Sequence, residues 1–189
     1  TECGAGEACQ DGYCAPEGAA PPAIGDVIFN EILYDPADGL SDARAEWIEV
    51  VSVSANPISL HGCELGDANG SSGIEGVFLR TGDFALFARS ADPVENGGLT
   101  PNGVFSFSLN NGGDTLTLTC GNTVIDTVIY GAATEFPEQS QGSIQLDPNQ
   151  QDADQNNLGR SWCPADQVYL ADPQHFGTPG AANTACPAE

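Results

Sequence analysis

Short runs of β-forming residues recur along most of this chain, and turn-forming pairs such as Asn-Gly separate them. Nowhere does an apolar period of 3.6 residues persist over three turns, so we expect little helix. The spacing predicts an all-β fold, an antiparallel β-sandwich of immunoglobulin type with seven to nine strands, and a barrel is the alternative. The strand-like runs before the last hairpin are residues 26–34, 45–54, 57–65, 76–80, 83–90 and 104–109.

The clearest single element is residues 115–131, TLTLTCGNTVIDTVIYG, in which a Gly-Asn pair separates two alternating runs. This pattern predicts two antiparallel strands joined by a two-residue turn. Pairing outward from the turn predicts an inward face of Leu116, Leu118, Cys120, Ile125 and Ile129. The opposite face of the hairpin, with Asp126 and Val128, is expected to tolerate water. Cys120 should therefore point inward, where a disulfide would join the two layers of the sandwich.

Seven cysteines without metal-type CxxC spacing indicate an oxidising compartment. Four of them belong to the main body and allow three connectivities. We expect Cys63 to pair with Cys120, and Cys163 with Cys186, because the second pair would clip the chain end onto the preceding segment. Each bond should stabilise the fold by roughly 3 to 4 kcal/mol.

The remaining cysteines, Cys3, Cys9 and Cys14, lie within a Gly-rich stretch too short for its own core. We expect residues 1–14 to form a small disulfide knot, with a zinc site as the competing and less favoured account. Seven is odd, so one thiol is left over, most economically in this knot. Residues 15–23, rich in Pro and Ala, indicate a linker, and residues 24–189 the main domain.

The charge of the chain is far from balanced. Twenty-seven acidic residues face four arginines and no lysine, for a formal net charge of −23. Such a field repels phosphate backbones and anionic lipids, so we expect neither nucleic acid nor a membrane as partner. The absence of lysine removes Schiff-base chemistry. No apolar run approaches the roughly 20 residues that cross a bilayer, and we expect a mature secreted form, extracellular or at the cell surface.

The residues that could support catalysis favour a protein that is not an enzyme. His61 and His175 are far apart in sequence, and a triad would need one of them beside a nucleophile and an acid. Cys63 lies two residues from His61, but a disulfide-bonded cysteine cannot attack a substrate. For the acidic strand residues we favour a structural role over a glycosidase-type carboxylate pair. These are Glu31, Glu46 and Glu49.

Calcium is the one cofactor that the sequence suggests. Residues 147–159 place Asp152, Asp154 and Asn156 at alternate positions, where an irregular loop can turn three oxygens toward one hard cation. The segment departs from an EF-hand loop, because its glycine comes two residues late and a cysteine stands where a bidentate glutamate belongs. An ordinary acidic loop is the alternative. A second acidic loop of the same kind contains Asp35, Asp38 and Asp42.

Several segments together resemble the lamin tail domain family in its secreted bacterial form. They occur in the family's order and spacing, at residues 24–36, 46–50, 58–67, 110–131 and 176–183. Where the family often has tryptophan after a glycine, this chain has Cys63, and a disulfide to Cys120 would replace the missing aromatic bulk. The residues that match the family motifs are Asn30, Glu31, Glu46, Trp47, Glu49, Gly177, Thr178, Pro179, Gly180 and Asn183.

The resemblance implies an immunoglobulin-like sandwich without catalytic machinery. Our leading hypothesis is a non-catalytic extracellular module that binds a protein or a surface through loops or a sheet edge. A second hypothesis is a self-assembling filament or surface-layer subunit, which would use a detached arm of residues 1–23 and its odd cysteine to bind another copy. A third is an accessory domain of a secreted hydrolase.

Overall fold

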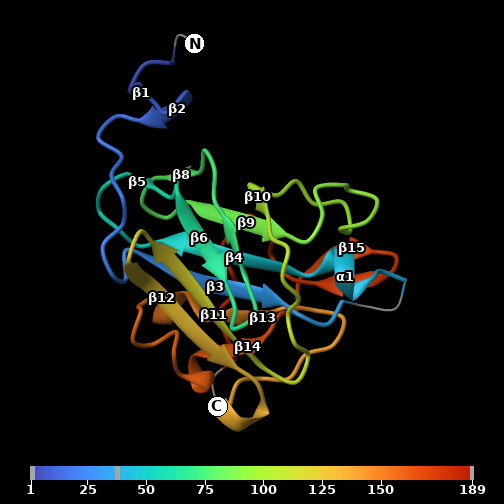
Figure 1. Ribbon diagram of the computed structural model, residues 1–189. Helices are drawn as coiled ribbons and strands as arrows, with labels where there is room; N and C mark the ends of the chain where they lie inside the picture. Colours follow the sequence, from blue (N-terminus) through green and yellow to red (C-terminus); the bar gives the residue numbers. More distant parts are fainter. Residues whose placement is uncertain (1–2, 37–38, 188–189) are drawn as a thin grey trace.

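Two β-sheets packed face to face form the body of the molecule (Figure 1). The computed structural model describes residues 3–36 and 39–187. The larger sheet has the strand order β10-β9-β4-β3-β13-β14, and the smaller sheet has the order β12-β11-β6-β7. Neighbouring strands pair antiparallel except β10 and β9, which are parallel. The prediction of an all-β sandwich is confirmed.

The strands of the larger sheet are β10 (Gly103–Val104), β9 (Phe84–Ala88), β4 (Trp47–Ser52), β3 (Val27–Leu33), β13 (Ile144–Leu146) and β14 (Trp162–Pro164). Those of the smaller sheet are β12 (Thr123–Tyr130), β11 (Asp114–Cys120), β6 (Cys63–Gly66) and β7 (Ser71–Gly73). Three strand pairs stand outside them: β1 (Glu7–Gln10) with β2 (Tyr13–Pro16), β5 (Ile58–Ser59) with β8 (Phe78–Leu79), and β15 (Val168–Ala171) with β16 (Gln174–Phe176).

Helix is confined to single turns in the described residues: α1 (Asp42–Ala45), η1 (Ala132–Thr134), η2 (Pro148–Gln150) and η3 (Gly159–Ser161). None of them is long and apolar enough to cross a bilayer. The scarcity of helix agrees with the missing 3.6-residue period.

The central strands of the larger sheet are buried on both faces. Every residue of β3 and β4 is buried. In β4, Ile48 and Val50 face the smaller sheet and join a core cluster with Leu116 of β11. Trp47 alternates with them and belongs to a second apolar cluster, so it lies on the outer face. Tyr169 and residues 178–180 of the later chain cover part of this outer face, and Leu99 packs against the same apolar cluster.

The hairpin of β11 and β12 forms as predicted, but its expected register is wrong. Gly121 starts the two-residue turn with φ of 60°, which suits the first turn position of a type II′ hairpin. The register shifts after Leu118, which pairs with Asp126 and not with Ile125. Because of this shift, the residues of β12 from Asp126 onward face the opposite side of the sheet from the one expected. Asp126 and Val128 are therefore buried, whereas Ile129 is 51% exposed.

Three disulfides are formed, and two of them are the pairs favoured from the sequence. Cys63 bonds Cys120, and Cys163 bonds Cys186. The first bond does not join the two layers as expected. Cys63 of β6 and Cys120 of β11 are directly opposite each other in the smaller sheet, so this bond fastens neighbouring strands of one layer.

The N-terminal residues form a hairpin that contacts the body. In Figure 1 the hairpin of β1 and β2 lies at the top, above β5 and β8. A disulfide joins Cys3 to Cys14, and the ring of Tyr13 lies 6.5 Å from that of Phe78. The segment expected to be a linker makes backbone hydrogen bonds to the strand β5 region through Ala20. The arm is thus docked along part of its length and not detached.

Candidate functional site

A row of buried polar side chains crosses the outer face of the larger sheet. Glu49 of β4 lies opposite Glu31 of β3, and Glu31 lies opposite Gln145 of β13. At most 1% of each residue is exposed. Directly opposite residues on neighbouring strands point to the same face, so these three side chains form one row. We call Glu49, Glu31 and Gln145 the outer polar row.

Residues 177–184, which we call the C-terminal strap, cover the two carboxyl groups of this row. The backbone N–H of Thr178 donates to Glu31 Oε1 at 2.9 Å, and the Thr178 hydroxyl lies 2.9 Å from Glu31 Oε2. The backbone N–H of Gly180 donates to Glu49 Oε2 at 2.5 Å. The strap thus places hydrogen-bonding groups over both carboxyls.

The third member of the row ties down the far end of the strap. Gln145 Nε2 donates to the carbonyl oxygen of Thr184 at 3.1 Å and to its hydroxyl at 2.8 Å. Cys163 lies opposite Gln145 on β14 and bonds Cys186, just beyond the strap. The strap therefore ends at a covalent anchor on the edge strand of the sheet.

Two asparagines link the strap to the sheet. Asn30 Nδ2 donates to Glu49 Oε1 at 2.9 Å and to Asn183 Oδ1 at 3.2 Å. Asn183 Nδ2 returns two bonds, to the carbonyl oxygens of Asn30 at 3.0 Å and Leu146 at 2.8 Å. Both asparagines are buried, and these bonds satisfy backbone groups that would otherwise lack partners.

Trp47 and Gly177 close the other end of this region. Trp47 donates its indole N–H to the Tyr169 hydroxyl at 3.3 Å, with the two rings edge to face. A Cβ atom on Gly177 would lie 3.0 Å from both Trp47 Cζ2 and Ser143 Oγ. The missing side chain of Gly177 therefore lets the strap pass close over the sheet.

The structure gathers nine of the ten motif residues expected from the resemblance into this one region. They are Asn30, Glu31, Trp47, Glu49, Gly177, Thr178, Pro179, Gly180 and Asn183. Burial raises the pKa of Glu31 to about 7, and burial together with the charge of Glu31 raises the pKa of Glu49. Both carboxyls are covered, so this region fastens the fold and offers a substrate no access.

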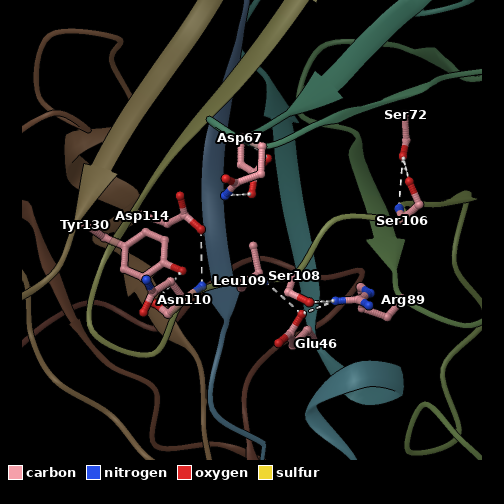
Figure 2. Close-up of polar contacts among 11 residues, drawn as sticks. Glu46, Asp67, Ser72, Arg89, Ser106, Ser108, Leu109, Asn110, Asp114 and Tyr130 are labelled. Atoms are coloured by element: carbon pink, nitrogen blue, oxygen red, sulfur yellow. Dashed lines mark hydrogen bonds and ion pairs between the residues drawn. The ribbon is translucent and has the colours of Figure 1, made fainter.

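The tenth motif residue, Glu46, lies apart and binds an arginine (Figure 2). Glu46 Oε2 accepts from the Arg89 guanidinium at 2.9 Å and from the backbone N–H of Leu109 at 3.0 Å. Arg89 also donates to the Ser108 hydroxyl at 2.8 Å. Burial nevertheless raises the pKa of Glu46 to about 7, outweighing the Leu109 and Arg89 bonds that lower it. Of the three glutamates from which a carboxylate pair could be assembled, only Glu31 and Glu49 lie opposite each other.

Arg89 also lines a pocket of about 480 Å³, between α1 and the edge strands β7 and β10, which we call the edge pocket. Arg44 of α1 reaches the same pocket with 57% of its side chain exposed, and Val104 of β10 is 50% exposed. Ser72 and Ser106 also line the pocket, and their hydroxyl oxygens lie 3.2 Å apart. Figure 2 shows these two side chains pointing toward each other. The pocket combines cationic, hydroxyl and apolar groups.

Sequence reasoning did not find the edge pocket or Gln145. The pocket had one signal, since two of the four arginines in this acidic chain, Arg44 and Arg89, line it. Their residue numbers are far apart, and only the strand order brings them together. Gln145 had no signal, because a single glutamine in a short strand looks like a solvated residue.

The histidines and Cys63 form no nucleophilic centre with one another. His61 Nδ1 lies 3.0 Å from a carboxylate oxygen of the exposed Glu75. His175 is fully buried in β16. Cys63 is held in its disulfide and cannot act as a nucleophile.

The proposed calcium ligands point in different directions. Asp152 and Asp154 are exposed, and the Asp152 carboxylate accepts the backbone N–H of Asp154 at 2.9 Å. Asn156 is fully buried and donates its amide to Asp126 at 2.6 Å. Across residues 3–36 and 39–187, no group of three or more His, Cys, Asp or Glu side chains is arranged to hold a metal ion. Calcium binding through this loop stays a prediction.

The second acidic loop is described only in part, since Asp38 lies outside the described residues. Asp35 accepts a hydrogen bond from Asn111 Nδ2 at 3.3 Å and lines a polar pocket with Tyr34. Asp42 opens the helical turn α1. The structure therefore places Asp35 and Asp42 in different local environments.

The fold and its buried polar region define an immunoglobulin-like, disulfide-bonded β-sandwich closed by a C-terminal strap. The family model of the lamin tail domain matches residues 20–132, more than half of the 189-residue chain. This chain belongs to the lamin tail domain family. No curated protein and no solved structure matches it.

Proposed function

We propose that this protein is a non-catalytic extracellular interaction module that binds its partner at the edge pocket. Membership of the lamin tail domain family supports an interaction module. Three disulfides support an oxidising, extracellular setting. The observation that carries the location is that two of the chain's four cations, Arg44 and Arg89, line one pocket between the edge strands of both sheets.

The groups in the pocket favour a partner that presents a carboxylate next to an apolar side chain. Arg44 is half exposed, and its contact with Glu95 is long, at 3.6 Å between Nη1 and Oε2. Exposed ion pairs of this kind contribute little, so a partner carboxylate can displace Glu95 at small cost. Val104 offers an apolar surface beside it, while Arg89 is held in place by Glu46.

The test compares two blocked dipeptides, N-acetyl-Val-Glu-amide and its Val-Gln counterpart, by NMR titration of the full chain. We expect shifts for the amides of Val104 and Ser106 with the acidic peptide and weaker ones with the neutral peptide. Arg44→Glu should abolish the shifts. Arg160→Glu is the matched control, because it makes the same charge change at an exposed residue outside the pocket. Equal loss in both variants would contradict the proposed location.

A second candidate function is covalent self-assembly through Cys9. Cys9 is exposed in β1 and is the one cysteine of the seven without a disulfide. Sedimentation under oxidising conditions should show a dimer that reductant and Cys9→Ser each convert to monomer. A strictly monomeric protein under oxidising conditions would rule this candidate out.

A further inference from the structure

The hairpin of β1 and β2 brings three cysteines together. Cys3 bonds Cys14 of β2, whereas Cys9 of β1 is a free thiol. Cys9 lies directly opposite Cys14 in the hairpin. Directly opposite residues of an antiparallel pair point to the same face, with Cβ atoms about 4.5 to 5.5 Å apart. The free thiol therefore lies beside one sulfur of an existing disulfide.

The backbone hydrogen bonds show that Cys9 and Cys14 form the closer of the two kinds of opposite pair. The backbone N–H of Glu17 donates to the carbonyl oxygen of Gly6 at 2.9 Å, so these two residues form a hydrogen-bonded pair. Hydrogen-bonded and non-hydrogen-bonded pairs alternate along an antiparallel ladder. Cys9 and Cys14 lie three pairs farther along, and the register between them is regular. They are therefore a non-hydrogen-bonded pair, in which the side chains lie closer together.

The smaller sheet shows that two cysteines placed in this way can bond. Cys63 of β6 and Cys120 of β11 lie directly opposite each other, with Cα atoms 4.2 Å apart, and form a disulfide. Cys9 and Cys14 have the same relation across β1 and β2. A bond between Cys9 and Cys14 is thus compatible with the present register of the hairpin.

The sulfur that would leave is outside the strand pair. Cys3 precedes β1, which begins at Glu7, so its release breaks no strand pairing. Cys9 and Cys14 are both exposed, and Cys3 is half-buried. The attacking thiol, the attacked sulfur and the leaving sulfur therefore belong to one hairpin with open access from solvent.

We propose that this hairpin is a thiol–disulfide exchange site, in which the Cys9 thiolate attacks Cys14 and releases Cys3. The Cys9–Cys14 bond forms as the Cys14–Cys3 bond breaks. Cys3 leaves as a thiolate and takes up the proton that Cys9 lost. One thiol and one disulfide are present before and after the step, so it needs no oxidant or reductant. The inference is independent of the edge pocket and, because it acts within one chain, of a dimer through Cys9.

The exchange moves the reactive thiol along the chain. In the present pairing the thiol is held in β1, whereas after the exchange it belongs to Cys3, ahead of the strands. The substrates of such a site are the thiols and disulfides of other molecules, because both react by the same attack of a thiolate on a disulfide sulfur. Either Cys9 or Cys3 can then supply the attacking thiolate.

The test locates the free thiol in the full chain. The protein is held at pH 8 without air for several hours, because the thiolate is the nucleophile and uncatalysed rearrangement takes minutes to hours. A pulse of light iodoacetamide marks the free thiol, and heavy iodoacetamide marks the other cysteines after reduction and unfolding. Tandem mass spectrometry of the N-terminal peptide then places each label. We expect part of the light label to shift from Cys9 to Cys3, and the unreduced peptide to contain a Cys9–Cys14 bond.

Two variants separate this exchange from other sources of a free Cys3 thiol. Cys9→Ser removes the attacking thiol, so Cys3 should lose the light label completely. Cys3→Ser removes the leaving sulfur, and refolding it with oxidised glutathione should join Cys9 to Cys14. Light label on Cys9 alone in the native protein would overturn the proposal, as would light label on Cys3 in Cys9→Ser. Failure of Cys9 to bond Cys14 in Cys3→Ser would refute the geometry on which it rests.

Discussion

Gly177 shows how closely the strap approaches the larger sheet. Any side chain at this position would meet Trp47 and Ser143 at 3.0 Å, both of them in the buried outer region. We expect Gly177→Ala to lower the free energy of unfolding by roughly 1 to 3 kcal/mol, because the strap or the Trp47 ring must shift. Urea denaturation measures this loss.

The control for Gly177→Ala is Gly73→Ala in the edge strand β7. Gly73 has open space around the position of a Cβ atom. It is also absent from the glycines with positive φ, so alanine fits its backbone. We expect Gly73→Ala to change stability by less than about 0.5 kcal/mol. Equal losses in the two variants would contradict the close approach at Gly177.

Single residues of the outer region could be named from the sequence, but their shared role could not. The family resemblance points to Asn30 and Asn183, which lie 153 positions apart. Nothing in the sequence around either residue indicates that the Asn30 amide bonds the Asn183 side chain or that the Asn183 amide bonds the Asn30 backbone. The sequence analysis assigns Glu31 and Glu49 a structural role without indicating what they contact. The strap buries them, and a strand pattern does not show what covers a face from another part of the chain.

At the scale of elements, the disulfides fasten different kinds of structure. Cys63–Cys120 closes a separation of 57 residues and ties β6 to β11, whereas Cys163–Cys186 closes 23 residues and anchors the strap. Removing the first pair with two alanines should cost about 4 kcal/mol, and removing the second about 3 kcal/mol.

Hydrogen exchange separates the two disulfide variants beyond their stabilities. Loss of Cys163–Cys186 should raise exchange mainly in residues 177–184, because only there does the bond hold a segment without its own strand pairing. Loss of Cys63–Cys120 should raise it in β6 and β11. Identical exchange maps for the two variants would contradict these separate roles.

The calcium prediction also belongs to one element, the loop of residues 147–159. Calcium should raise the melting temperature of the native protein relative to chelator if the loop binds it. The Asp152→Ala, Asp154→Ala double variant should then lose this difference. The burial of Asn156 leaves only two of the three proposed ligands, Asp152 and Asp154, accessible to an ion. An identical melting temperature with calcium and with chelator in the native protein would contradict calcium binding by this loop.

The alternating sequence pattern predicts which strands form better than it predicts the register in which they pair. The β11–β12 hairpin and its Gly121 turn follow from alternation and turn chemistry. The bulge after Leu118 has no marker in the sequence, yet it buries Asp126, whose carboxylate then accepts the backbone N–H of Phe29 at 2.8 Å. This one-residue shift in register thus creates a hydrogen bond between β12 of the smaller sheet and β3 of the larger sheet.

At the scale of the whole molecule, stability should fall as pH rises. Burial raises the pKa of Glu31 and of Glu46 from 4.5 to about 7. Between these values the native state binds more protons than the unfolded chain, so the free energy of unfolding decreases with increasing pH. The net charge of −23 adds repulsion in the same direction. We expect a higher melting temperature at pH 5.5 than at pH 8.

Salt distinguishes the two contributions to this pH dependence. About 1 M sodium chloride screens repulsion among exposed carboxylates but leaves buried groups largely unscreened. Part of the difference between pH 5.5 and pH 8 should therefore persist at high salt. It should become smaller in a Glu31→Gln, Glu46→Gln double variant but not vanish, because burial also raises the pKa of Glu49, which remains. An equal melting temperature at pH 5.5 and at pH 8 would contradict the raised pKa values of these buried carboxyl groups.

The strap also sets the smallest piece of this chain that can stand alone. The family match ends at residue 132, whereas the groups that cover Glu31 and Glu49 come from residues 143–183. A fragment cut at the end of the match would expose two carboxyls and an unpaired edge of β3, with nothing left to shield either. We therefore expect expression boundaries taken from the family match alone to yield an aggregating fragment, and boundaries that extend through Cys186 to yield a folded one.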